Sequence, residues 1–404
     1  MAIYVAASLA ASLAAWAGAT GSAAAQPQLR CRDRLTHPFA STSIWNTAIG
    51  SEAEYVAAHI YTYVPPPPPP PPGTDVCAAG KANPAQRRGC PGWQSHWTGA
   101  DCVQHGCCSV TTPNPDPQHY PWCFSKPGAA APSVNDPDRM YVDIDYFIAT
   151  APTDPPTPFV DQGWWGSDAQ CGRDHCCRKP GARTIGTLPF PRDWTINMTS
   201  NNAAAVLMPD RETLVRFQPL VRCTPGSPLF SLPPAEFMNW PGKKNLSILG
   251  DGAWGAHGGS HLSSIGGTVR RGELLPSAPP IPHALKLMLF AERYYWPGNA
   301  SVPCFRWPAL NCDGPNPCKG CAPGPGSGNF YNGSNPHLRP GALLAVPPAL
   351  SAGIATNIST PVAKRLLDAL TDYGGYLDDN TASNSGAFVS APTHPTPPSL
   401  PAAS

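Results

Sequence analysis

The spacing of six cysteines constrains the fold of this chain more than any other feature of its sequence. They lie at Cys77, Cys90, Cys102, Cys107, Cys108 and Cys123. A segment of about 50 residues buries too little apolar surface to fold unaided, so small secreted modules are cross-linked by disulfides. Each disulfide that closes a loop of this size contributes on the order of 3 kcal/mol. Six cysteines allow 15 pairings, and spacing alone does not select one of them.

The order of these cysteines points to a known type of module. A Cys-x4-Cys-Cys step ends at Cys108, and Pro121-Trp122-Cys123-Phe124 follows. This pattern resembles the trefoil (P-type) domain over residues 74–127. The resemblance implies the bridges Cys77–Cys108, Cys90–Cys107 and Cys102–Cys123. It also implies an extracellular module with a shallow aromatic cleft that contacts glycans, lined here by Trp93, Trp97, Tyr120 and Trp122. The alternative is that these aromatic side chains pack against the disulfides.

Several features predict a secreted protein of the extracellular space or cell wall. Residues 1–25 are apolar and alanine-rich and end in Ala23-Ala24-Ala25, as a secretory signal peptide does. Fifteen cysteines suit an oxidising compartment. Five glycosylation sequons begin at Asn197, Asn245, Asn299, Asn332 and Asn357. The net charge is +1, and no segment is long and apolar enough for a membrane span. We therefore expect no nucleic-acid partner and no membrane insertion.

Proline divides the chain into segments. Residues 65–72 are an unbroken proline run, which predicts a polyproline II linker over residues 65–73. The segments on either side, 26–64 and 138–390, read as one main domain interrupted by the trefoil-like module. Residues 391–404 are rich in Pro, Ser and Thr and predict a disordered tail. With 54 prolines in the chain, short strands and turns are favoured over long helices.

The main domain has the pattern of a mainly β fold. Strand signals occur at 141–148, 204–208, 213–221, 246–249, 284–290 and 342–346, and the second and third of these read as a hairpin. One helix is signalled by a Thr360 cap, Pro361 at its first position, a stripe of Val362, Leu366, Leu367 and Leu370, and Gly374 at its end. We predict a β-sandwich or jelly-roll-like core with one peripheral C-terminal helix.

Five short motifs of the main domain resemble secreted microbial proteins of unassigned activity. They are Phe39–Thr47, Gly255–Ser260, Ser264–Gly267, Pro282–Leu285 and Phe305–Pro308. Outside the trefoil-like module, Cys171, Cys176 and Cys177 read as a stapled loop, and Cys304, Cys312, Cys318 and Cys321 read as another. The resemblance of the five motifs to secreted microbial proteins does not assign an activity to this chain.

The segment from Asp251 to His283 has the densest group of residues suited to catalysis. His257 and His283 are candidate acid–base residues, with Glu273 or Asp251 as the partner carboxylate and Arg306 as the charge stabiliser. This set would suit a glycoside hydrolase or a polysaccharide lyase. The alternative is that both histidines are hydrogen-bonded core residues. Glycines between His257 and His261 disfavour a helix on which the two could share a metal. We expect no metal and no cofactor.

Two further groups have weaker signals. Trp164 and Trp165 stand in a glycine-flanked loop and could form an aromatic platform for a sugar, or could fill the core. The pairs Asp143/Asp145 and Asp378/Asp379 read as solvated charges of strands and loops rather than as a hydrolytic pair.

Together these observations predict a secreted carbohydrate-active protein that acts on an extracellular glycan or polysaccharide. The competing interpretation is a non-catalytic lectin-like or cell-wall and matrix structural glycoprotein. A cysteine-rich protein that recognises other proteins is a third. Geometry separates the first two, because an enzyme needs His257, His283 and a carboxylate in one cleft. A lectin needs only exposed aromatic side chains in a shallow groove.

Overall fold

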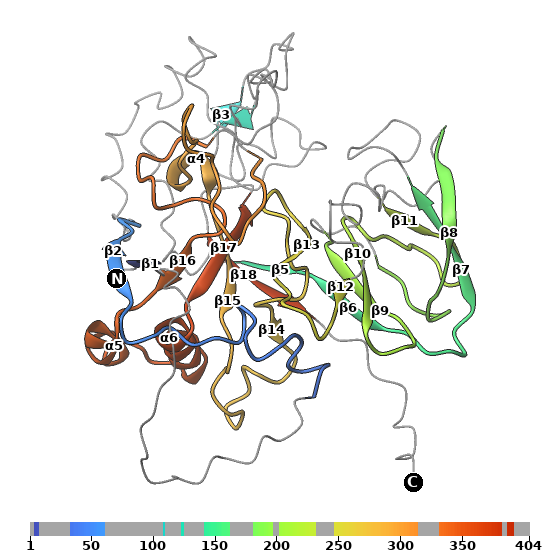
Figure 1. Cartoon of the computed structure of the whole chain (residues 1–404), viewed down its shortest axis with the longest axis horizontal. Helices are drawn as coiled ribbons and strands as arrows, with labels where there is room; N and C mark the ends of the chain where they lie inside the picture. Colours follow the sequence, from blue (N-terminus) through green and yellow to red (C-terminus); the bar gives the residue numbers. More distant parts are fainter. Residues whose placement is uncertain are drawn as a thin grey trace, which may run out of the picture.

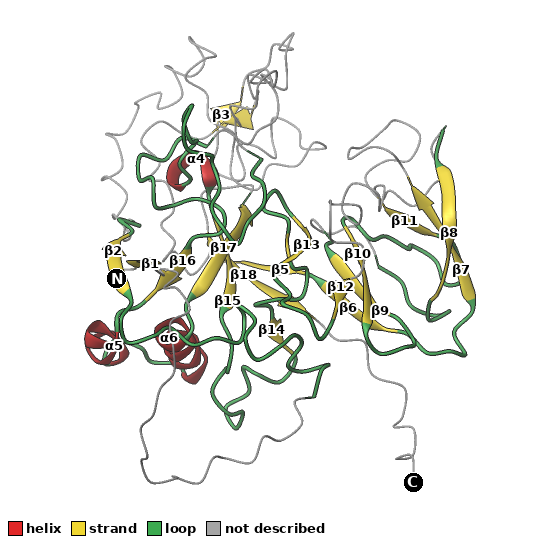
Figure 2. Cartoon of the chain, viewed as in Figure 1, coloured by secondary structure: helices red, strands yellow, loops and turns green. Residues whose placement is uncertain are grey.

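Strands dominate the described part of the chain (Figures 1 and 2). The computed structural model describes residues 4–7, 33–60, 108–109, 123–124, 141–161, 181–196, 202–231, 246–313, 331–381 and 386–391. In these residues two helices exceed one turn, α5 (Pro348–Ala355) and α6 (Pro361–Asp372), and α4 (Ala291–Tyr294) is a single turn. The mainly β prediction is confirmed.

The largest sheet is mixed and has eight strands. Its order is β14-β18-β15-β17-β16-β1-β2, and β5 also pairs with β18. The strands are β1 (Tyr4–Ala7), β2 (Glu54–Ala57), β5 (Tyr141–Ile144), β14 (Val269–Arg270), β15 (Leu285–Leu289), β16 (Leu343–Ala345), β17 (Gly375–Asn380) and β18 (Gly386–Ala391). Strand β1 lies within the segment predicted as a signal peptide. The central pair, β15 and β17, is parallel.

Two smaller sheets lie beside each other on the right of Figure 1. One has the order β12-β10-β9-β6, and the other has the order β11-β7-β8. The predicted hairpin is confirmed, since β9 and β10 pair antiparallel with Leu207 opposite Leu214. The strands are β6 (Tyr146–Ala149), β7 (Pro156–Asp161), β8 (Arg183–Pro189), β9 (Ala204–Leu207), β10 (Thr213–Phe217), β11 (Leu229–Ser231) and β12 (Leu246–Ser247).

The strand predicted over residues 141–148 is wrong at Asp145. The chain leaves the large sheet after β5 and enters the four-stranded sheet at β6, so Asp145 stands at the break. Because Asp145 is completely buried, this junction places a carboxylate between two sheets, in the interior.

Helix α6 begins and ends as its sequence predicts. The Thr360 hydroxyl accepts a hydrogen bond from the backbone N–H of Ala363, at 3.2 Å, which satisfies one of the free donors of the first turn. Leu367 and Leu370 are buried, but Val362 is 37% exposed, so the apolar stripe is narrower than predicted. Helix α5 was not predicted, because it buries no residue and its sequence has no amphipathic pattern.

The two faces of the large sheet differ in chemistry. Leu285, Leu287 and Leu289 of β15 join an apolar cluster with Leu367 and Leu370 of α6. Burial of each such side chain contributes about 1.5–3 kcal/mol. Side chains alternate across a strand, so Lys286 projects from the opposite face. That face is covered by the segment 251–267 and by a second apolar cluster.

Most of the cysteine-rich region lies outside the described residues. Within the part of this region that is described, β3 (Cys108–Ser109) pairs antiparallel with β4 (Cys123–Phe124), and Cys108 is disulfide-bonded. Cys77, Cys90, Cys102 and Cys107 fall outside the described residues, so all three predicted bridges and the trefoil stay predictions. The four module aromatics, the proline run, Trp164, Trp165, Asn197, Asn245 and most of the tail also fall outside. Cys304 and Cys312 form a disulfide. Asn299, Asn332 and Asn357 are exposed.

No helix among the described residues has the length and apolar character needed to cross a bilayer.

Candidate functional site

The motif Gly255–Ser260 positions a buried histidine. Strand β13 (Trp254–His257) ends at His257, and the chain then turns through Gly258, whose φ is +49°. A Cβ at Gly258 would lie 2.2 Å from the carboxyl group of Asp379. Only glycine fits this position, since the backbone is left-handed and rests directly on a carboxyl group. The motif therefore packs a tight turn against the Asp379 side chain.

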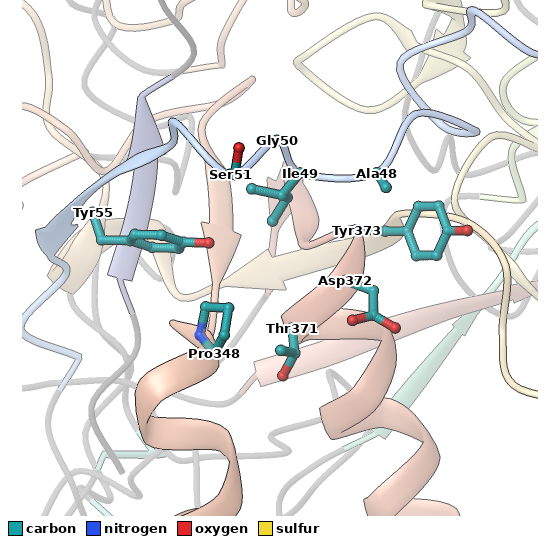
Figure 3. A pocket seen from close by; sticks show the side chains of 9 residues that line it. All are labelled: Ala48, Ile49, Gly50, Ser51, Tyr55, Pro348, Thr371, Asp372 and Tyr373. Atoms are coloured by element: carbon teal, nitrogen blue, oxygen red, sulfur yellow. The ribbon is translucent and has the colours of Figure 1, made fainter. Parts of the chain in front are cut away.

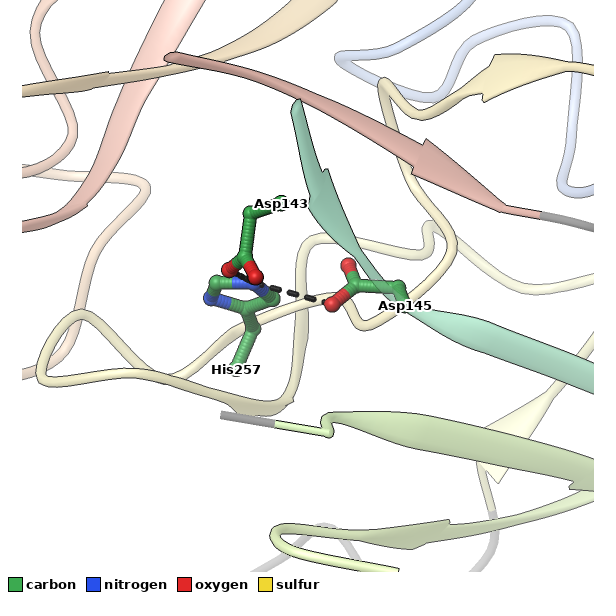
Figure 4. A group of neighbouring side chains, drawn as sticks. All are labelled: Asp143, Asp145 and His257. Atoms are coloured by element: carbon green, nitrogen blue, oxygen red, sulfur yellow. Dashed lines mark ion pairs between the residues drawn. The ribbon is translucent and has the colours of Figure 1, made fainter. Parts of the chain in front are cut away.

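His257 lies between carboxylates on both ring nitrogens, and Figure 4 shows the two of them that belong to Asp143 and Asp145. Its Nε2 is 3.0 Å from Oδ1 of Asp145 and 3.8 Å from Oδ2 of Asp143, and its Nδ1 is 2.6 Å from Oδ2 of Asp378. His257, Asp145 and Asp378 are completely buried, and Asp143 is 4% exposed. These four residues are called the His257 cluster below. They come from β13, β17, β5 and the junction that follows β5.

A buried lysine offsets part of the negative charge of the His257 cluster. Lys286 of β15 donates from Nζ to Oδ2 of Asp145 at 2.8 Å and to the carbonyl of Ser263 at 2.6 Å. The Ser260 hydroxyl donates to Oδ1 of Asp378. Arg216 donates to the Ser263 hydroxyl at 2.6 Å and so binds the same residue of the loop as Lys286. Each buried charge thus has a charged or hydrogen-bonded neighbour, as burial requires.

Burial and charge act against each other in the His257 cluster. Burial alone would lower the pKa of His257, but Asp145 and Asp378 raise this pKa well above its usual value of 6.5. Burial raises the pKa of Asp145, because His257 and Lys286 only partly compensate for lost water. Burial has the same effect on Asp378, yet His257, Lys286 and Ser260 lower the pKa of Asp378 below 3.8. The two carboxyl groups that flank one imidazole are therefore shifted in opposite directions.

The prediction that Asp143/Asp145 and Asp378/Asp379 are solvated is wrong, because all four are buried. Asp143 lies in β5 and Asp145 follows at the break, and both carboxylates lie close to Nε2 of His257. The register of β15 and β17 shifts beside Asp378 and Asp379: Leu287 pairs with Leu377, but Leu289 pairs with Asn380. Two residues of β17 therefore face one of β15, which interrupts the alternation of sides.

The other four motifs of the main domain pack around the segment that carries His257. The Trp45 indole donates to the carbonyl of Gly252 at 2.7 Å, and a Cβ at Gly266 would lie 2.2 Å from the Trp45 ring. The backbone N–H of Ala284 donates to the Trp45 carbonyl at 2.7 Å. The Trp254 indole donates to the carbonyl of Pro308 at 2.8 Å. All five motifs thus converge on the loop that holds His257.

The predicted catalytic residues do not meet in one place. Nε2 of His283 lies 3.1 Å from Glu273, and both contact neighbours other than the His257 cluster. Within the described residues no hydrogen bond or ion pair joins His283 to His257. Asp251 is exposed and accepts a hydrogen bond from the N–H of Ala253. Arg306 is half-buried, and its N–H donates to the Pro340 carbonyl.

The His283–Glu273 pair predicts a loss of stability in acid. Burial and the nearby Arg270 lower the pKa of His283 below 6.5. Burial would raise the pKa of Glu273, but hydrogen bonding to His283 lowers it below 4.5. Both folded-state values lie below the unfolded ones, so the stabilisation is complete above about pH 6.5 and declines as the pH falls through 4.5. Each unit of pKa difference corresponds to about 1.4 kcal/mol.

Urea unfolding between pH 7.5 and pH 4 measures this decline. The matched variant His283→Asn keeps a neutral hydrogen-bonding group near the Ala284 carbonyl but does not titrate. We expect the midpoint of this variant to fall less steeply below pH 6.5 than that of the wild type. If the urea midpoint changed with pH equally in the variant and the wild type, the lowered pKa of His283 would be contradicted.

Sequence reasoning missed Lys286, Ser260 and Arg216. One signal for Lys286 was present: it is the single charge in the apolar strand Leu285–Leu289. A lysine inside a buried strand requires a buried partner. The spacing of Asp143 and Asp145 was a second signal.

A surface pocket of about 370 Å³ is lined by none of these residues (Figure 3). Tyr55 and Tyr373 stand at opposite ends of its lining in this view, with Thr371 and Asp372 between them. It is lined by Ala48, Ile49, Gly50, Ser51, Tyr55, Pro348, Thr371, Asp372 and Tyr373. The pocket therefore combines two aromatic rings with one carboxylate and two aliphatic hydroxyl groups.

Comparison with known proteins gives no relative: no protein-family model, no curated protein and no solved structure matches this chain.

Proposed function

We propose that this protein is secreted and binds an extracellular carbohydrate. The observation that carries the proposal is the pocket between Tyr55 and Tyr373. Sugar rings present C–H faces that stack on aromatic rings, and their hydroxyl groups need polar partners. Asp372 supplies an acceptor, and Ser51 and Thr371 supply hydroxyl oxygens at the same pocket. The trefoil-like module and a sandwich or jelly-roll-like arrangement, which lectin domains use, belong to the same proposal.

Binding has more support than cleavage. His257 and His283 are both completely buried, and they belong to two separate groups. Acid–base catalysis requires a group within hydrogen-bond reach of the substrate. The Tyr55–Tyr373 pocket is open to the surface and needs no rearrangement to meet a glycan.

A glycan and polysaccharide screen of the full-length protein tests the proposal, followed by affinity measurements on the best ligand. We expect Tyr373→Ala to weaken binding about tenfold, a loss of about 1.4 kcal/mol, since the stacking surface disappears. Trp307→Ala is the matched control, because Trp307 is an aromatic residue 60% exposed outside the pocket. Its affinity should equal that of the wild type.

The same screen detects the alternatives. New reducing ends or unsaturated uronates that disappear in His257→Ala and His283→Ala, with the fold intact, would establish an enzyme. Binding that survives Tyr373→Ala but is lost when residues 74–127 are removed would place the glycan on the trefoil-like module. No binding and no cleavage across the screen would contradict the proposal.

A further inference from the structure

Three donor atoms of the His257 cluster converge at metal-binding distances. Oδ2 of Asp143, Oδ1 of Asp145 and Nε2 of His257 all lie within 4.8 Å of one another. Two donors that bind one zinc ion at about 2.1 Å in a tetrahedron lie roughly 3.4 Å apart. The distances from Nε2 are 3.0 Å to Asp145 and 3.8 Å to Asp143, on either side of that value. The spacing therefore fits donors that share an ion.

The same three atoms lack other partners. Each is buried, and none makes a hydrogen bond with acceptable geometry. The Asp143 carboxylate is more than nine-tenths buried, and its Oδ2 lies 3.8 Å from Nε2 of His257 (Figure 4). Buried polar atoms without partners are rare, and each requires a physical explanation. Donors that share one ion do not need to be aligned for hydrogen bonding to one another.

Neighbouring groups hold two of these donors in position. Asp378 lies 2.6 Å from Nδ1 of His257, and a carboxylate at one ring nitrogen leaves the other nitrogen as the lone-pair donor. Lys286 binds the second oxygen of Asp145 at 2.8 Å and so turns Oδ1 toward His257. Outer contacts of this kind are typical of metal ligands.

The charges around His257 also match a divalent cation. The His257 cluster contains three carboxylates, and the ammonium group of Lys286 pairs with two of them, Asp145 and Asp378. A histidine that ligates a metal ion is neutral, so two negative charges would then be unmatched in a region without water contact. Isolated buried charges are costly, and one divalent ion would balance both. One nitrogen and two oxygen donors suit a first-row transition ion such as zinc better than calcium or magnesium.

We propose that Asp143, Asp145 and His257 form a structural binding site for one divalent transition-metal ion, with Asp378 and Lys286 as positioning residues. The site lies in the interior where β5, β13, β15 and β17 meet, and is separate from the Tyr55–Tyr373 pocket. Binding would couple to folding, because the donors come from segments more than 100 residues apart. The proposal does not depend on the glycan function.

Zinc titration of the chelator-treated, full-length protein tests this site. We expect one zinc ion per chain by calorimetry and elemental analysis. X-ray absorption at the zinc edge should show a nitrogen and oxygen shell with imidazole scattering and no sulfur. The absence of sulfur scattering is decisive, because the chain has 15 cysteines and cysteine thiolates are the competing zinc ligands. We expect Asp143→Asn to weaken binding by about 100-fold or more, and Asp378→Asn by about 10–100-fold, as for an outer contact.

Glu273→Gln is the matched control, because it alters the other histidine–carboxylate pair and should bind zinc like the wild type. Failure of the wild type to bind zinc stoichiometrically, sulfur ligation, or equal affinity of Asp143→Asn and the wild type would each overturn the proposal. The absorption spectrum of the wild type decides the question even where a variant fails to fold.

Discussion

Lys286→Met is expected to destabilise the metal-free protein by about 3–5 kcal/mol, the cost of breaking a buried ion pair. The lysine is completely buried and donates to Asp145 and to the Ser263 carbonyl. Methionine has a similar length and no charge, so the packing is largely kept. The loss would come from the Asp145 carboxylate and the Ser263 carbonyl left without their partner. Chemical unfolding followed by circular dichroism, after chelator treatment, measures this change.

Lys364→Met is the matched control for this result. Lys364 stands exposed on α6, and surface substitutions usually change stability by less than about 0.5 kcal/mol. Adding Asp145→Asn to Lys286→Met should recover part of the loss, because the two groups are directly paired. If Lys286→Met cost no more than Lys364→Met, the ammonium group would not be buried against carboxylates in solution.

Gly258→Ala should have the second large effect, and two separate costs contribute to it. The left-handed backbone at φ +49° costs a residue with a Cβ about 1–2 kcal/mol. The added Cβ would also meet the Asp379 carboxyl group at 2.2 Å. Forcing the buried neighbours apart adds about 1–3 kcal/mol. We expect the free energy of unfolding of Gly258→Ala to be lower than that of the wild type by the sum of the backbone cost and the crowding cost.

Gly272→Ala isolates the first of these costs. Gly272 has φ +94°, but a Cβ there meets nothing within 4 Å. The difference between the two variants therefore measures the crowding against Asp379. Equal losses would show that the turn at Gly258 does not rest on the acidic side chains.

Local patterns predicted the elements whose causes are local. The Thr360 cap, Pro361 and the apolar spacing located α6, and turn residues between two apolar runs located the β9–β10 hairpin. Residue 145 shows where local patterns fail, because the side chains around it alternate in character as they would in one continuous strand. The two halves of that run pair with different sheets, and pairing partners remote in sequence leave no local signal.

The His257 cluster was only half predictable for the same reason. His257 stood out among its glycines, and the five motifs that surround it were recognisable as motifs. Its carboxylates were assigned to solvent as charges of strands and loops. Asp378 and Asp379 are adjacent, and neighbours in a regular strand point to opposite faces. The register shift beside Asp378 removes that rule, and it depends on how β17 pairs with β15.

The order of the large sheet determines how the trefoil-like module can be exchanged. Residues 61–140 connect β2, at one edge of the sheet, to β5, which pairs with β18 near the other edge. Six strand-to-strand steps separate β2 from β5, about 29 Å at about 4.8 Å per step. The strands on either side of this segment are thus not neighbours in the sheet. A replacement of residues 61–140 therefore needs at least about nine extended residues, whereas removal of residues 74–127 leaves enough chain on both sides.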